Sequence, residues 1–456
     1  MAGLLDRILD YVAAAPALDA SDPALPRAER SIADTLAVMM AGARSEVAAP
    51  LVSYASGQGG GVPLLGTGLN AAPETAALVN GAFGHAFDFD DGFPGYPVHA
   101  SNVAVAALIA AMGAAPVRGV DFTRAYAVGV EVAVAVGRRI GIRHYERGFH
   151  ATGTIGVFAG VAAQSALLGA EPATTRNAFA IAASAASGLQ RNFGTMVKPL
   201  HAGWAARSAV AAVALARAGL AGHHDALEGP DGFFAAYGDS GDPSASLAPP
   251  AFDALRTTGL GLKKFPCVNA CHRPIDALLT LRRTHGLEPE NVRAILCRVP
   301  PGSLRPIKYV APATPHEAKF SMHYLLAAAL ADGRIDLGSF TEAAASRTEL
   351  HPLFDRIELR EDGALAGPPG ETKGPGTRGR IALTVETVDG RRLEAEVEFA
   401  PGNPRREMTR ADLAEKFAGC AMFAGVAADR ATALADRVLD LRAVDDMRAL
   451  LDTLRP

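Results

Sequence analysis

The chain has 456 residues, of which 49% are hydrophobic and 20% charged, a composition that excludes a mainly disordered protein. Its length corresponds to two or three domains of about 100–200 residues each. With 44 lysines and arginines against 48 aspartates and glutamates, the net charge of −4 excludes a general attraction to nucleic acid or to an anionic membrane. Any anion-binding site must therefore be local.

The amino-terminal residues MAGLLDRILDYVAAA carry Asp6 and Asp10 within an apolar stretch. A secretory signal has a basic start and an uninterrupted apolar core, so we expect the protein to remain in the cytoplasm. Further along, residues 148–169 contain no Asp, Glu, Lys or Arg, but they include His150, Gln164 and several glycines. This pattern predicts a buried helix and no membrane span.

Residues 1–265 follow a helical pattern almost throughout. Apolar residues at helical spacing predict a helix over 27–43, and another over 202–220 that ends before Gly222. Asp121 is expected to cap the helix that follows it. The density of alanine and glycine lets such helices approach closely, which predicts a compact all-α domain.

The pattern changes after Pro266 and becomes helical again from Thr409. Between these points strands are predicted at 291–299, at 351–361 and on both sides of the turn Asp389–Gly390, with helices at 274–285 and 320–331. We therefore predict a mainly α protein. A large all-α helical domain consists of 1–266 and a returning segment, 404–456, and a smaller α+β domain, 267–403, is inserted between them.

Cysteine usage argues against disulfides and against metal. Cys267, Cys271, Cys297 and Cys420 are too few and too unevenly spread for a disulfide framework, which agrees with a reducing compartment. Cys267, Cys271 and His272 have no second ligand pair at a finger-like spacing, so small residues around a turn are the better interpretation.

Lysine is scarce, because only seven of the 44 basic residues are lysines. Arginine serves equally well on a solvated helix face, so a retained lysine points to a use for its compact ammonium group. The first three lysines of the chain are Lys198, Lys263 and Lys264, which we select as candidate anion-binding residues.

The densest polar motif is GHAFDFDDGFPGYPVHAS, which contains His85, Asp88, Asp90, Asp91 and His99. Paired acids near a histidine supply a carboxylate that orients or accepts a proton and an imidazole that titrates near neutrality. The structural alternative is a helix end with solvated acids. A metal site is ranked low because no repeated oxygen-ligand pattern follows.

Two further motifs lie in the helical part of the chain. ERGFHATGTIG places His150 among small residues that leave space beside its ring, although a structural helix cap is the alternative. GTMVKPLHAGWAARS contains Lys198 and His201 near the start of a predicted helix, whose amino end adds donors for an anion.

The last two motifs lie where the pattern has changed. LKKFPCVNACHRPIDA carries Lys263 and Lys264 at the junction, and domain junctions are favoured places for clefts. AKFSMHYLLAAALADG places Tyr324 on a helix, where its hydroxyl can donate a hydrogen bond or the ring can simply pack in the core.

Taken in order and at these separations, the five motifs resemble those of the MmgE/PrpD family over nearly the whole chain. That family includes 2-methylcitrate dehydratase, cis-aconitate decarboxylase and iminodisuccinate epimerase. The resemblance implies a large helical domain, an inserted α+β lid, a homodimer, and a site between the two that uses neither metal nor cofactor. Its site groups correspond to Asp88, His99, His150, Lys198, Lys263 and Tyr324.

The chain departs from the family pattern beside the first motif. Many members have threonine after DFDD where this chain has Gly92, and HPS where it has His99-Ala100-Ser101. A threonine hydroxyl would offer a hydrogen bond to substrate that Gly92 lacks. These differences keep substrate and reaction type open.

We expect a hydro-lyase that acts on a small hydroxy-polycarboxylate similar to 2-methylcitrate by acid–base chemistry. His99 or His150 exchanges the proton in this hypothesis, Asp88 orients a histidine and Tyr324 assists. The carboxylates of the di- or tricarboxylate are bound by Lys198, Lys263, His201 and Lys264.

Three alternatives remain. The same site can support epimerisation or racemisation of an imino- or amino-dicarboxylate, or decarboxylation of the cis-aconitate type. A non-catalytic helical scaffold is less favoured, because a scaffold has no need for all six matched groups.

Overall fold

The structure is a computed structural model, and it describes residues 3–15, 19, 21–94, 96–113, 115–238, 253–367 and 379–455. The fold is mainly α, as the sequence predicts. The chain divides into two compact units: unit 1 comprises 1–86, 90–260 and 409–456, and unit 2 comprises 87–89 and 261–408. Within the described residues, no helix combines the length and the apolar character needed to cross a membrane.

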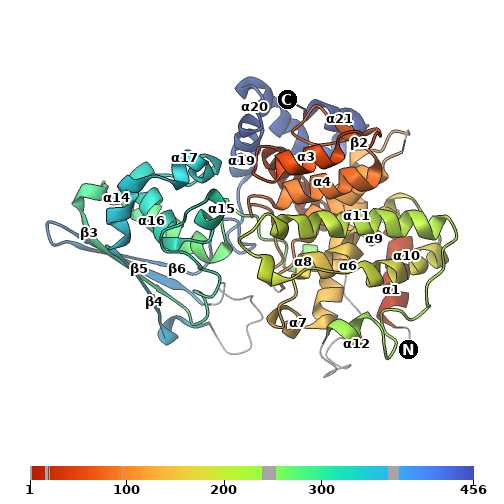
Figure 1. Cartoon of the computed structure of the whole chain (residues 1–456), viewed down its shortest axis with the longest axis horizontal. Coiled ribbons are helices and arrows are strands. Elements are labelled where there is room, and N and C mark those ends of the chain that lie inside the picture. The colour runs from red at the N-terminus through yellow and green to blue at the C-terminus, as the bar shows by residue number, and fades with distance from the viewer. Residues whose placement is uncertain are drawn as a thin grey trace. The chain divides into compact units, whose positions relative to one another are not determined.

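In its described residues, unit 1 consists of helices and a short antiparallel strand pair (Figure 1). The strands are β1 (Val62–Pro63) and β2 (Asn70–Ala71). The helices before residue 260 are α1 (Leu4–Ala13), α2 (Ala24–Gly42), α3 (Ala48–Ala55), α4 (Pro73–His85), α5 (Ala100–Ala111), α6 (Gly119–Ile140), α7 (Arg143–Glu146), α8 (Ala151–Thr154), α9 (Gly156–Leu167), α10 (Pro172–Ala185), α11 (Val197–Arg217), α12 (Phe233–Tyr237) and α13 (Ala254–Thr257).

Glycines allow the central helices of unit 1 to pack unusually closely. A Cβ atom added to Gly81 on α4 would lie 2.9 Å from the Cα of Gly203 on α11, and one added to Gly203 would overlap the carbonyl oxygen of Leu78. A Cβ atom on Gly42, at the end of α2, would overlap the backbone of Phe83 on α4. Close helix approach therefore follows from the small residues that the sequence supplies.

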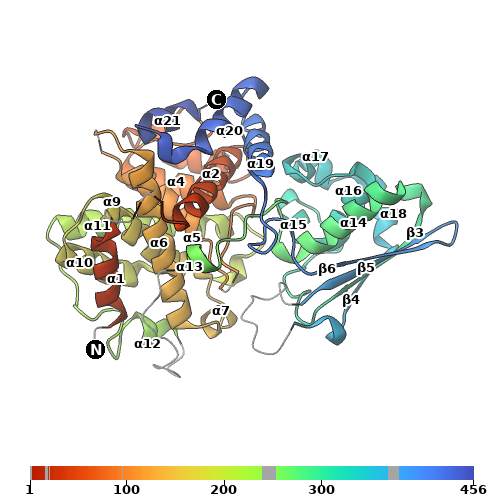
Figure 2. The same ribbon diagram turned by 180° about the vertical axis from the view of Figure 1, so that it is seen from behind.

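The carboxy-terminal segment belongs to unit 1 and consists of α19 (Arg410–Phe423), α20 (Ala428–Val438) and α21 (Met447–Thr453). Helix α19 packs on α2, so the two ends of the chain lie side by side, as the blue and red ribbons of Figure 2 show. Lys416 of α19 forms a buried ion pair with Asp34 of α2, with Nζ 2.6 Å from Oδ1. This pair joins segments that are far apart in sequence.

Unit 2 contains a four-stranded sheet with the order β4-β3-β5-β6, in which β3 and β4 are parallel and the other neighbours antiparallel. Helix α14 packs on β5 and β6, and α16 packs on α14 (Figure 1). The hydrophobic core of the unit lies among these elements and includes Tyr324, Leu325 and Leu383. The bounds are β3 (Val292–Val299), β4 (Ile357–Glu361), β5 (Ile381–Thr387), β6 (Arg392–Val397), α14 (His272–His285), α15 (Pro315–Ala318), α16 (Met322–Asp332), α17 (Glu342–Ala345) and α18 (His351–Phe354).

The hairpin expected around Asp389–Gly390 is confirmed, because β5 and β6 pair antiparallel on either side and Gly390 has a φ of 86°. The strand expected over 351–361 is wrong in its first half. Residues His351–Phe354 form the short helix α18, and the strand begins only at Ile357. Pro352 favours this outcome, since proline suits the first turn of a helix and cannot donate to a strand ladder.

Two helix predictions in unit 1 need correction. Asp121 does not cap its helix, because α6 already starts at Gly119, whose N–H donates to the Val444 carbonyl. Asp121 instead lies in the first turn and pairs with Arg118 and Arg124. The buried helix expected over 148–169 is two helices, α8 and α9, which meet at Ile155.

The helix expected over 202–220 both begins and ends earlier in the chain than predicted. Helix α11 begins at Val197, which places Lys198 in its first turn, and it ends at Arg217. Gly219, with a φ of 97°, lies just beyond the end of the helix, where Gly222 had been expected.

Candidate functional site

Unit 1 gathers four imidazoles from four separate segments. His85 ends α4, His99 precedes α5, His150 precedes α8, and His201 lies in the second turn of α11. The ring centroids of His85 lie 4.8 Å from His99 and 5.5 Å from His150, and those of His150 and His201 are 5.2 Å apart. Three of these histidines are buried and His99 is partly buried. We call these four residues the histidine cluster.

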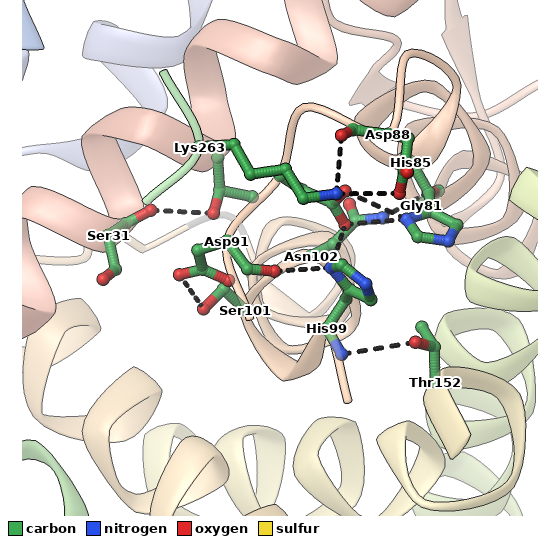
Figure 3. A network of polar contacts seen from close by, with 12 residues as sticks. Ser31, Gly81, His85, Asp88, Asp91, His99, Ser101, Asn102, Thr152 and Lys263 are labelled. Atoms are coloured by element: carbon green, nitrogen blue, oxygen red, sulfur yellow. Dashed lines mark hydrogen bonds and ion pairs between the residues drawn. The ribbon is translucent and has the colours of Figure 1, made fainter. Parts of the chain in front are cut away.

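His99 is held by its own loop (Figure 3). Its Nδ1 lies 2.5 Å from the carbonyl oxygen of Asp91, and its backbone N–H donates to Oγ1 of Thr152 at 3.2 Å. A carbonyl oxygen only accepts hydrogen bonds, so Nδ1 must carry a proton. In the neutral ring the lone pair is therefore on Nε2, which defines the tautomer of His99.

A buried hydrogen-bond chain supports the loop that holds His99. The Ser101 hydroxyl donates to Oδ2 of Asp91 at 2.6 Å, and its oxygen lies 2.5 Å from the Tyr126 hydroxyl, which receives a further hydrogen bond from Ser31. Burial raises the pKa of Asp91 well above its ordinary value, aided by the charges of Asp34 and Asp90. Burial thus favours the neutral form of the Asp91 side chain.

His150 and His201 share a hydrogen bond between their Nδ1 atoms, 3.0 Å apart. Burial lowers the pKa of His150 well below its ordinary value, and positive charge on His85 and Lys198 lowers it further. Burial and the same two residues lower the pKa of His201 to about 4. The pair is therefore neutral near pH 7, and one ring donates through Nδ1 while the other accepts.

Lys198 adds a fixed positive charge beside this pair. It is buried in the first turn of α11, and its Nζ lies 5.5 Å from the centroid of the Phe193 ring. The Phe193 ring in turn meets the His150 ring edge-on at 4.9 Å. Cation–π contact of this kind holds a lysine charge in partly desolvated surroundings.

His85 and Asp90 form an ion pair that our sequence analysis did not select. The two carboxylate oxygens of Asp90 lie 2.8 and 3.0 Å from Nδ1 of His85, and both side chains are fully buried. Both residues stand in the first motif, so their chemistry was visible, but a helix-end histidine five residues before an acid carries no specific signal. In the structure Asp90 contacts a histidine through its carboxylate, and the orienting role expected for Asp88 stays a prediction.

His85, Asp90 and His99 also offer ligand atoms within 4.8 Å of one another, which is compatible with a metal ion. Both Nδ1 atoms carry protons that are donated to Asp90 and to the Asp91 carbonyl, so a metal ion would have to bind these rings through Nε2.

The remaining expected site residues belong to unit 2. Lys263 is buried, and its Nζ lies 2.9 Å from Oδ1 and 2.7 Å from the carbonyl oxygen of Asp88 (Figure 3). Asp88 is held at a φ of 51°, a left-handed conformation that few residues other than glycine adopt. Lys264 is exposed. The Tyr324 hydroxyl is buried and donates to the carbonyl oxygen of Ser339.

The structure brings buried imidazoles and a lysine together in a mainly helical unit, an arrangement suited to proton transfer or anion binding. Comparison with known families places the chain. The MmgE/PrpD N-terminal domain matches residues 6–246 and the MmgE/PrpD C-terminal domain matches residues 265–441. The chain belongs to the MmgE/PrpD family.

Curated relatives cover most of the chain at low identity. Cis-aconitate decarboxylase of Homo sapiens is 29% identical over 415 residues, which span 87% of this chain and 83% of that protein. Cis-aconitate decarboxylase of Mus musculus is 28% identical, with 87% and 82% covered. Cis-aconitate decarboxylase of Aspergillus terreus is 26% identical over 475 residues, with 96% and 92% covered.

Proposed function

We propose that this protein is a lyase that decarboxylates a small unsaturated tricarboxylate of the cis-aconitate type. The observation that carries this proposal is the charge balance of the histidine cluster. Lys198 lies beside the buried His150 and His201, Asp90 pairs with His85, and burial raises the pKa of Asp91 well above its ordinary value, which disfavours a second negative charge. Such a cluster attracts an anion locally although the whole chain is slightly negative.

Lys198 and the neutral pair of His150 and His201 are the proposed carboxylate-binding groups. An ammonium group supplies charge-assisted hydrogen bonds, and a neutral imidazole adds a donor without a second charge. The names of the relatives favour decarboxylation over the dehydration that we expected from the sequence. In decarboxylation the bond to one carboxylate breaks and carbon dioxide leaves, so the protein must supply one proton to the remaining carbon.

Dehydration of a 2-methylcitrate-like hydroxy acid is the second candidate, and the tautomer of His99 favours it. A neutral imidazole with its lone pair on Nε2 can accept the proton next to a carboxylate, and dehydration needs such a base. Decarboxylation needs no base at this step. Both reactions place His99 and His150 against the reacting part of the substrate.

Proton NMR in deuterium oxide separates the candidates. With cis-aconitate, decarboxylation is expected to release carbon dioxide and to place one deuterium on the product carbon. With 2-methylcitrate, dehydration would produce a new alkene, and an epimerase would exchange a hydrogen without forming one. If none of these acids is converted and none raises the melting temperature, the proposal fails and a non-catalytic scaffold is supported, since a ligand that binds only the native state must raise that temperature.

A further inference from the structure

The end of helix α4 carries a buried acid–imidazole pair with one nitrogen unused. Nδ1 of His85 donates to the Asp90 carboxylate at 2.8 Å. Nε2 of His85 is buried and has no hydrogen-bond partner among the residues that the structure describes. A buried polar atom without a protein partner is unfavourable, so this nitrogen is a favourable position for a polar group of a ligand.

The surroundings of His85 place this nitrogen among the groups of the histidine cluster. The His85 ring lies between those of His99 and His150, stacked on the latter with an interplanar angle of 26°. Helix packing fixes its backbone, because a Cβ atom added to the preceding residue, Gly84, would overlap the side chain of Asn102 on α5. A ligand that reaches Nε2 of His85 therefore lies beside two further imidazoles.

Within the histidine cluster, His85 makes a shorter contact with the Asp90 carboxylate than His99 does, 2.8 against 3.5 Å. Its Nδ1 faces the Asp90 carboxylate, whereas the Nδ1 atoms of His150 and His201 face each other. Positive charge on His85 is one of the causes that lower the pKa of both His150 and His201. The titratable and charged groups that face or surround His85 are Asp90, Asp91, His99, His150, His201 and Lys198.

We propose that His85, oriented by Asp90, is a further catalytic residue whose Nε2–H binds the substrate anion and delivers the proton in the lyase reaction. The inference rests on the proposed function. It assigns the acid to a residue outside the set transferred from the family resemblance.

His85 delivers one proton in either candidate reaction. In decarboxylation the carbon–carbon bond breaks, its electron pair stays on the substrate carbon, carbon dioxide leaves, and the Nε2 proton forms the new C–H bond. In dehydration the carbon–oxygen bond breaks, the pair stays on oxygen, and the Nε2 proton converts the leaving hydroxyl to water while a base takes the alpha proton. In each case neutral His85 then regains a proton from solvent.

Three variants test the two roles of Nε2. His85→Gln retains an N–H donor near the position of Nε2 but cannot transfer a proton, and His85→Leu retains neither property. Asp90→Asn removes the charge that favours the His85 cation. His144→Gln is the matched control, because His144 is a buried histidine whose two nitrogens lie near the Tyr237 carbonyl and the Thr154 hydroxyl.

The expected results separate binding from proton transfer. His85→Gln should bind citrate and cis-aconitate in a thermal-shift titration within about threefold of wild type, yet lose at least about 100-fold in kcat, the lower limit for general acid catalysis. His85→Leu should lose both. If His85 is the acid, kcat decreases at high pH, where His85 has lost its proton. Asp90→Asn should move this high-pH limb of the kcat profile to lower pH, because His85 no longer faces a carboxylate. His144→Gln should leave the midpoint of that limb in place.

Three outcomes would overturn the inference. They are kcat of His85→Gln within about tenfold of wild type on the converted acid, a pH limb that Asp90→Asn leaves in place, and binding by folded His85→Leu equal to that of wild type. If wild type converts no polycarboxylate, the proposed function has failed and the proton-delivering role fails with it. The anion-binding role of Nε2 is then decided by comparing the thermal shifts of His85→Gln and His85→Leu.

Discussion

His150 and His201 face each other through Nδ1 atoms 3.0 Å apart, so a single proton lies between two imidazoles that are neutral at pH 7. If the accepting ring gains a second proton, both Nδ1 atoms become donors and the hydrogen bond is lost. The contact therefore couples the protonation of the cluster to its geometry and to the stability of unit 1.

This coupling predicts how stability depends on pH. In the unfolded chain histidine titrates near its ordinary pKa of 6.5, whereas in the folded protein the pKa of His201 is lowered to about 4. Between these values the unfolded state binds more protons, so stability is lost as pH falls from about 6.5 to about 4. The melting temperature should therefore decrease as the pH is lowered from about 6.5 to about 4.

Two variants isolate the contribution of the histidine pair. His201→Asn should show a shallower decrease, since one of the two titrating rings is gone, and the exposed His351→Asn should keep the wild-type slope. The raised pKa of Asp91 acts in the opposite direction, because a carboxyl that stays protonated when folded loses stability as pH rises. Equal slopes in His201→Asn and wild type would contradict the assignment.

The hydrogen-bond chain behind His99 predicts a loss of stability. Ser101→Ala leaves the Asp91 carboxyl and the Tyr126 hydroxyl without their shared partner, which should cost about 1–3 kcal/mol in urea unfolding. Thr123→Ala is a control, because its buried hydroxyl bonds only to the Gly119 carbonyl within its own helix. If Ser101→Ala changes the unfolding free energy by less than about 0.5 kcal/mol, this hydrogen-bond chain does not stabilise the fold.

The ion pair between Lys416 and Asp34 predicts a cooperative effect between the two ends of the chain. Lys416→Met leaves the Asp34 carboxylate buried without its cation, and we expect a loss of about 3–5 kcal/mol by urea unfolding. The double variant Lys416→Met with Asp34→Leu should recover most of that loss. For comparison, Arg392→Met removes an exposed pair with Glu394 and should cost less than about 1 kcal/mol. Similar costs at the two sites would refute the prediction.

Gly92, next to His99 in space, is predicted to accept a side chain. A Cβ atom there would lie 3.7 Å from its nearest neighbours, the His99 ring and the Val98 carbonyl oxygen, which is ordinary contact. Gly92→Thr should therefore change the unfolding free energy by no more than about 0.5 kcal/mol. Because the new hydroxyl lies beside His99, we expect KM for the converted acid to change.

The control for Gly92→Thr is Gly42→Ala, whose Cβ atom would overlap the Phe83 backbone. This variant should lose stability, since backbone cannot move aside as a flexible side chain can. Equal losses of unfolding free energy in the two variants, measured by the same urea titration, would show that Gly92 has no room for a side chain.

The sequence predicted the helical character, the family and most of the residues of the histidine cluster. Helical periodicity and the order of the motifs can both be read from the sequence alone. It did not predict that His85 would be paired with Asp90, since that contact depends on how the chain turns after α4. Tyr324 shows the converse limit. A tyrosine on a helix is equally compatible with a site and a core, and its contact with the Ser339 carbonyl leaves the catalytic role a prediction.

The glycine contact between α4 and α11 has a consequence for how such a protein can evolve. Gly81 and Gly203 leave no room for a side chain, and these two helices carry His85, Lys198 and His201. Substitutions that shift either helix would disturb all three residues at once and are expected to be purged. Variation is expected instead in the loop from Gly92 to Val98, so a lineage can change its substrate there while its proton-handling groups keep their positions.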